Sequence, residues 1–290
     1  MVWLFVIFIS CEDVVEVEVP TDNARLAVEG LIRVDRTQPF IPIAVKVSLT
    51  NNFFEEIPVA AVESIVIIVD EIEDGNIVAS SSSSLAEEVP GTGVYTPDPN
   101  FSSDQRVSTV ILDGEVNFTL LITYLGRRYL AVTKYVPTSP IDSVFQGNGT
   151  LFDEDDTEAI ISFTDNPNRE DYYLFDFGFG DYLVTEDEFY KGQQFQFSWF
   201  YDQTFESGTE LEISILGATE EFYNYMDQLI EQAGDLQGPF QTPVATVRGN
   251  IFDVTDLDNI EVFDNVDQPN LFPLGYFAIV QEFKRTLTIE

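Results

Sequence analysis

Apolar and polar residues alternate along much of the chain, and this alternation predicts β-strands. Two strands are predicted before residue 50. Residues 65–79 form the clearest predicted hairpin, because the Asp74-Gly75 pair favours a tight turn with positive φ. A second hairpin is predicted over 116–133. Short strands at this regular spacing predict an immunoglobulin-like β-sandwich over residues 22–137.

Two polar or stiff segments interrupt this pattern. The serine run 80–84 lies between strand-like segments, so an edge strand or a loop is predicted there instead of a flexible linker. Pro137 and Pro140 form a stiff joint after the second hairpin. The boundary between two domains is predicted at this joint.

Aromatic residues at every second position predict strands with one aromatic face in the second half. The two segments are 172–179 and 194–201. The residues expected to share a face are Tyr173, Phe175, Phe177 and Phe179 in the first segment, and Phe195, Phe197, Trp199 and Tyr201 in the second. We therefore predict an aromatic-rich β domain over residues 138–290.

One α-helix is predicted in this second domain, at about 219–233. Thr219 can cap its first turn, and Glu220 and Glu221 lie where the helix dipole favours anions. Apolar residues then recur at helical spacing, so one stripe of the helix is expected to pack on the sheet.

Three closing strands are predicted, at 245–252, 274–280 and 284–290. The predicted fold class is therefore mainly β. It consists of two β-sandwich-like domains, of which the first is immunoglobulin-like and the second carries the helix.

A short apolar segment precedes the single cysteine. Residues 2–10 are too few to span a bilayer, which takes about 20 apolar residues, but they fit the core of a signal peptide over residues 1–10. The Phe8-Ile9-Ser10-Cys11 run resembles the bacterial lipobox. Cys11 is therefore expected to carry diacylglycerol and an N-acyl chain such as palmitate, and to begin a lipid-anchored tether over 11–21.

Two points about this segment stay open. Alternatively, Cys11 could be a buried or free thiol that follows an ordinary signal peptide. The segment also lacks a basic n-region. We therefore expect translation to start a few residues upstream of Met1.

The charge of the chain limits its partners. Among 290 residues, 51 are acidic and 13 basic, which gives a formal net charge of −38. The negative electrostatic field of such a charge repels phosphate backbones, so nucleic acid is not expected as a partner. With Cys11 bound to lipid no disulfide can form, and stability must come from core burial.

No histidine is present, which removes the commonest general base and the usual catalytic triads and histidine metal sites. We therefore predict a protein that is not an enzyme and has no cofactor. A pair of carboxylates could still hydrolyse a glycoside, but nothing favours one pair among so many acidic residues.

Two weak candidate sites remain. Asp253, Asp256 and Asp258 lie in one acidic loop and could hold Ca²⁺, which takes six to eight oxygen ligands, but a solvated acidic turn is the interpretation that the sequence favours. Trp199 and Tyr201 could stack on a sugar ring if they are exposed. Their competing interpretation is packing in the core.

Several short segments carry a family resemblance by their order and spacing. They are 11–13, 26–32, 140–144, 213–225, 238–244, 248–251 and 274–277. Together they resemble a family of Bacteroidota outer-membrane lipoproteins of unknown function, typically encoded beside TonB-dependent receptors of the SusC type. The acidic pair Glu12-Asp13 resembles the signal for transfer to the outer face. Asp142-Ser143-Val144 resembles a short O-glycosylation site of this phylum, which would place a glycan on Ser143.

The resemblance implies a surface-exposed accessory of an outer-membrane barrel and supplies no catalytic residues. The predicted function is a non-enzymatic lipoprotein, anchored in the outer membrane and facing the cell exterior. Its first-choice partner is a TonB-dependent transporter, with a role in nutrient capture or uptake. Two alternatives stay open: a structural subunit of an outer-membrane assembly or secretion complex, and a free-standing glycan-binding module.

Overall fold

The computed structural model describes residues 24–50, 58–151, 156–233, 246–255, 257 and 272–290. In these ranges the protein is mainly β. The strands are β1 Leu26–Val34, β2 Val45–Leu49, β3 Ser64–Glu73, β4 Asn76–Glu87, β5 Val94–Pro97, β6 Glu115–Tyr124, β7 Arg127–Val136, β8 Ile141–Gln146, β9 Thr157–Thr164, β10 Tyr172–Asp176, β11 Tyr182–Glu186, β12 Gln194–Tyr201, β13 Glu210–Ala218, β14 Phe252–Asp253 and β15 Leu274–Thr288. The helices are α1 Glu220–Ala233 and the short 3₁₀ turns η1 Thr109–Asp113 and η2 Asp187–Phe189.

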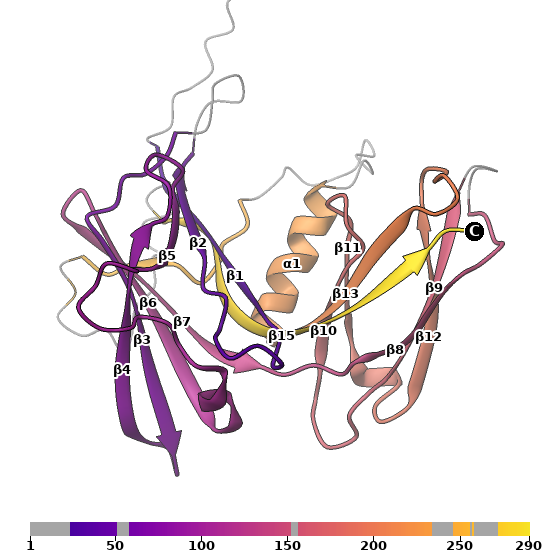
Figure 1. Cartoon of the computed structure of the whole chain (residues 1–290), viewed down its shortest axis with the longest axis horizontal. Helices are drawn as coiled ribbons and strands as arrows, with labels where there is room; N and C mark the ends of the chain where they lie inside the picture. The colour runs from indigo at the N-terminus through magenta and orange to yellow at the C-terminus, as the bar shows by residue number, and fades with distance from the viewer. Residues whose placement is uncertain (1–23, 51–57, 152–155, 234–245, 256, 258–271) are drawn as a thin grey trace, which may run out of the picture.

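Strand β15 joins the two halves of the protein, as its long yellow ribbon shows in Figure 1. Its first part pairs in parallel with β1, and its last part pairs antiparallel with β13. One sheet therefore runs through both halves, in the order β11-β10-β13-β15-β1-β2-β5-β4-β3-β6-β7-β14, and β15 also pairs with β7. A second sheet contains β12, β9 and β8.

Both predicted hairpins are present. Asp74 and Gly75 have φ values of 50° and 76° between β3 and β4, and Leu125 and Gly126 have 50° and 70° between β6 and β7. Positive φ at both central residues is the type I′ geometry that matches the twist of paired strands. The serine run lies inside β4, so the expected strand is confirmed.

Each half has its own hydrophobic core. The first core is formed by β1 to β7 and also includes Phe277 and Ile279 of β15. In the second half, the three-stranded sheet packs on β10, β13 and β15. The buried residues of this second core include Ile161, Phe163, Tyr173, Phe175, Tyr201, Ile213, Ile215 and Leu287.

Helix α1 covers the other face of β10 and β13. Leu174 and Leu216 alternate with the residues of the second core and contact Phe222 and Met226 of the helix. The Phe222 N–H donates to Thr219 Oγ1 at 3.1 Å, which is the predicted cap. The predicted helix and its buried stripe are confirmed. No helix in the part of the chain that the structure describes is long and apolar enough to cross a membrane.

Phe179 departs from the predicted aromatic face. Strand β10 ends at Asp176, and Phe179 is 70% exposed with a φ of 57° between two positive-φ glycines. The expectation that it shares a face with Tyr173 is wrong, because β10 ends at Asp176 and the chain turns over residues 178–180.

The predicted closing strands also need correction. Segments 274–280 and 284–290 belong largely to one strand, because β15 changes partner from β1 to β13 without turning. Of the described part of segment 245–252, which begins at residue 246, only Phe252 lies in a strand. Asn250 explains this, since its side chain, through Nδ2 and Oδ1, bonds the C=O and the N–H of Phe277, each at 2.8 Å.

The joint at Pro137 and Pro140 lies between β7 and β8, where the first core ends and the second begins. A Cβ on Gly217 of β13 would lie 2.4 Å from the Pro137 carbonyl oxygen. The joint is therefore packed against the sheet. The division into two domains at this point stays a prediction.

Candidate functional site

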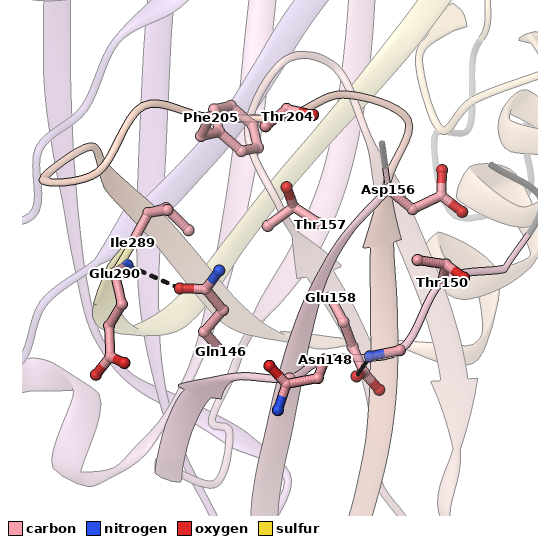
Figure 2. A pocket seen from close by; sticks show the side chains of 12 residues that line it. Gln146, Asn148, Thr150, Asp156, Thr157, Glu158, Thr204, Phe205, Ile289 and Glu290 are labelled. Carbon is pink, nitrogen blue, oxygen red and sulfur yellow. Dashed lines mark hydrogen bonds between the residues drawn. The ribbon is translucent and has the colours of Figure 1, made fainter. Parts of the chain in front are cut away.

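A polar pocket in the second half measures about 300 Å³. It lies at one end of β8 and β9, beside the loop after β12 and the last residues of the chain. Figure 2 shows Phe205 and Thr204 on one side, Asn148 and Glu158 on the other, and the Gln146 amide between them.

Glu158 has a structural role at the edge of this polar pocket. Its carboxylate accepts hydrogen bonds from the Gly149 N–H at 2.7 Å and the Ser198 hydroxyl at 2.5 Å. A Cβ on Gly147 would lie only 1.9 Å from Glu158 Oε2. Glycine is therefore required at 147 because the carboxylate occupies the space of a side chain.

The two amide side chains are better placed to meet a ligand. Gln146 Oε1 accepts from the Glu290 N–H at 2.8 Å, which leaves its NH₂ group to donate (Figure 2). Asn148 is exposed and forms no hydrogen bond within the described ranges. Amide groups beside the Phe205 ring are chemistry suited to a hydroxyl-rich ligand, because hydroxyls accept and donate while a ring packs on an apolar sugar face.

A second, apolar pocket of about 500 Å³ lies against helix α1. Trp199 lines it together with the helix residues Met226, Leu229, Ile230 and Ala233. The Trp199 Nε1–H is buried and finds no acceptor among the residues that the structure describes. Of the two aromatic candidates from the sequence, Trp199 therefore borders a pocket.

Tyr201 lies in the core. It is 1% exposed, and its hydroxyl donates to the Phe177 carbonyl at 3.1 Å. Burial raises the pKa of this hydroxyl above its ordinary value. In this position its ring has no face open to a sugar.

Asp253, the first calcium candidate, is buried in an ion pair. Its Oδ2 accepts from Arg127 Nε at 2.7 Å and also from Nη2, while its Oδ1 accepts from the Thr255 N–H at 2.9 Å. Asp256 and Asp258 lie outside the described residues. Within those residues no group of three or more metal-ligating side chains occurs.

The other predicted modification sites are Cys11 and Ser143. Cys11 lies outside the described residues, so its lipidation stays a prediction. Ser143 is exposed on β8, and its hydroxyl lies 2.8 Å from that of Ser162. Its side chain thus already has a partner.

A buried polar cluster near the proline joint was not predicted. The Tyr173 hydroxyl donates to Asp165 at 2.5 Å, and the Gly192 N–H donates to the same carboxylate at 2.6 Å. Burial raises the pKa of the nearby Asp171 above its ordinary value, although hydrogen bonds from Arg169 act in the opposite direction. No motif marks this cluster, because Tyr173 lies on β10 of the large sheet and Asp165 follows β9 of the small sheet, so the two meet only when the sheets pack.

The chain matches the family model described as "Domain of unknown function (DUF4249)" over residues 12–261, and it belongs to this family. No curated protein matches it. Among solved structures, a transglutaminase of red sea bream is similar at 9% identity with a TM-score of 0.23. That match covers 92% of this chain and 31% of the transglutaminase chain, and at such a TM-score it carries no argument.

Proposed function

We propose that this member of the DUF4249 family is a lipid-anchored protein of the outer-membrane surface. In this proposal it binds an outer-membrane β-barrel, specifically a TonB-dependent transporter, and assists nutrient capture without catalysing a reaction. The observation that carries the proposal is the lipobox-like run ending at Cys11, which only residues 12–23 separate from the first described residue, Ala24. A chain of that length spans at most about 45 Å, so an acylated Cys11 would keep the fold beside the membrane, within reach of a barrel.

Three carboxylates form hydrogen bonds that hold the fold together, which supports a binding role over a catalytic one. Asp165 holds a tyrosine and a backbone N–H, Asp253 pairs with Arg127, and Glu158 fills the space beside two glycines. A glycosidase needs two carboxyl groups about 5 to 9 Å apart that flank a bound sugar. These three are instead occupied in holding the fold together. The choice of a TonB-dependent transporter rests on the family resemblance of the sequence.

A free-standing glycan-binding module is the alternative that a specific observation favours. The polar pocket presents the amides of Gln146 and Asn148 beside the Phe205 ring. A module of this kind would bind sugar without any partner protein. The third possibility, a structural subunit of an assembly or secretion complex, would bind a barrel but no nutrient.

The test is purification of the native protein, with an affinity tag at its C-terminus, from detergent-solubilised outer membranes. Co-purification of a TonB-dependent receptor at a fixed ratio is expected. The matched control is Cys11→Ala, which should leave the membrane fraction and lose the receptor while the fold, measured by circular dichroism, is unchanged. Membrane residence of the alanine variant at the wild-type level would contradict the anchoring.

Two results would replace the proposal. Recovery of assembly or secretion components instead of a receptor would favour the structural subunit. A monomer that retains a glycan, and loses it in Asn148→Ala, would favour the glycan-binding module.

A further inference from the structure

Strand β4 has a long free edge. It pairs with β3 along most of its length, but β5 pairs with it only at residues 85–87. Residues 76–82 are all exposed, and residues 77–84 carry no charge, being Ile, Val, Ala and five serines. In a chain of net charge −38 this is an unusual stretch.

The direction of the backbone groups follows from Ser84. Its N–H donates to Gln105 Oε1 at 2.7 Å, and its C=O accepts from the Asp98 N–H at 2.9 Å, so both groups point away from β3. Backbone groups alternate along an antiparallel strand, and the register is regular from 79 to 85. Ser82 and Ser80 therefore also point their N–H and C=O groups away from β3.

The Ser84 groups are covered, whereas those of Ser80 and Ser82 have no hydrogen-bond partner in the part of the chain that the structure describes. Natural proteins usually protect such an edge with charged side chains, proline or a bulge. The one irregularity here lies between Ile77 and Ala79, next to the turn. The edge beyond it is regular and open to another strand.

The surroundings of this edge are acidic. No lysine or arginine occurs between Lys46 and Arg106, and Arg106 is paired with Asp104. Asp70 lies opposite Ser80 on β3, and Glu73 and Asp74 lie at the turn. An incoming strand with basic residues would complement this charge, whereas an acidic strand would be repelled.

We propose that the free edge of β4, at residues 79–82, is a docking site for an extended, basic segment of a partner protein, which adds to the sheet as a further strand. The segment's backbone bonds the N–H and C=O groups of Ser80 and Ser82, and its lysine or arginine side chains lie near the carboxylates around the hairpin. This inference goes beyond the proposed function and holds whether or not the partner is a barrel.

Two other possible occupants of the β4 edge complement its acidic surroundings less well than a basic segment does. A second copy of the protein would bring another charge of −38 to the same edge. Segment 12–18 of this chain has alternating apolar residues suited to a strand, but its polar residues are all acidic.

The probe for the test is a fluorescent seven-residue peptide of alternating threonine and valine with a lysine at each end. The full-length protein in detergent is expected to bind it, as measured by fluorescence anisotropy. Hydrogen exchange should slow at the Ser80 and Ser82 amides and stay unchanged at Ser81 and Ser83, which already face β3. The same peptide with glutamate ends should bind about fivefold more weakly at low salt, and added salt should reduce this difference.

Ser82→Pro removes one outward N–H at an edge position where proline is tolerated, and should weaken the lysine peptide about fivefold. Its matched control, Ser82→Thr, keeps the N–H and should bind as the wild type does. If the proline variant unfolds, Ser80→Lys keeps every backbone group. It should weaken binding of the lysine peptide and strengthen binding of the glutamate peptide.

Four outcomes would overturn the inference. These are equal binding of the two peptides, unchanged binding by both edge variants, exchange protection at another strand, and no binding at all. Protection of Ser80 and Ser82 that grows with protein concentration would identify a second copy as the occupant. Protection in the free protein that disappears when residues 12–18 are deleted would identify the chain's own segment.

Discussion

The Trp199 indole lies flat on the Phe177 ring, with ring centroids 4.1 Å apart and ring planes inclined by 2°. Phe177 follows β10 in the large sheet, while Trp199 belongs to β12 in the small sheet. The stack therefore ties the two layers of the second half together. Of the two stacked residues, Trp199 also lines the apolar pocket beside α1.

We expect Trp199→Ala to lower the free energy of unfolding by about 2–4 kcal/mol, because it removes this stack and opens a cavity between the sheets. Trp199→Phe keeps a ring on Phe177 and should cost less than half as much. Urea unfolding followed by circular dichroism gives both values. Equal costs for the two variants would show that a phenyl ring stacked on Phe177 does not stabilise the fold.

Gly147→Ala should destabilise the protein by about 1–3 kcal/mol, since the new methyl group would overlap the Glu158 carboxylate. Gly114→Ala is the matched control, because its Cβ would meet nothing closer than 3.9 Å and its φ is −103°. In a Glu158→Ala background, Gly147→Ala should have almost no further cost. A full cost in that background would place the strain elsewhere in the loop.

Arg127→Ala should lower the free energy of unfolding by about 1–3 kcal/mol, because it removes a partner of the Asp253 carboxylate, whose side chain is only 5% exposed. Lys46→Ala removes an exposed ion pair with Glu29 and should change stability by less than about 1 kcal/mol. If Asp253 binds calcium, added Ca²⁺ would stabilise the wild type and reduce the cost of Arg127→Ala. That result would revive the calcium candidate.

Asp171 should lower the free energy of unfolding as pH rises through its pKa. Its folded-state pKa is raised above its ordinary 3.8, chiefly by burial, so the folded protein holds this proton more tightly than the unfolded chain does. As pH rises from below 3.8 through the raised pKa, the wild type should lose stability relative to Asp171→Asn. Above the raised pKa, the difference between the two proteins should become constant.

The control for this pH series is Asp104, whose pKa is lowered to about 2 by hydrogen bonds from Arg106. Relative to Asp104→Asn, the wild type should gain stability as pH rises through that range, which is the opposite sign. Guanidinium unfolding at each pH measures both. A gain for Asp171 with rising pH would show that Arg169 outweighs burial.

Local sequence patterns predicted the parts of the fold that depend on local chemistry. The Asp74-Gly75 turn, the Thr219 cap and the core-facing aromatic positions of β12 each follow from neighbouring residues. The partner of β1 did not follow from any pattern, because it lies about 250 residues away. The role of Asn250 was not predicted either. It lies in a strand-like segment, and the pattern gives no sign that its side chain bonds the Phe277 backbone.

The candidate site was predictable only in part. Alternation placed Trp199 and Tyr201 on one face, but their different exposure depends on what the large sheet packs against each ring. The polar pocket combines residues near 146, 158, 205 and 290, which meet only after the sheets have packed. The need for small residues at Gly147 and Gly149 was not predicted, because the Glu158 carboxylate beside them lies on the next strand.

The pairing of β1 with β15 also has a consequence for the order of events during synthesis. The first strand of the fold needs a neighbour that is made about 250 residues later, and the first core needs Phe277 and Ile279 from that same neighbour. The first half of the fold therefore lacks one wall of its core until Phe277 and Ile279 have been synthesised. Contacts this distant in sequence slow folding. The first core should thus close only when residues 274–288 arrive.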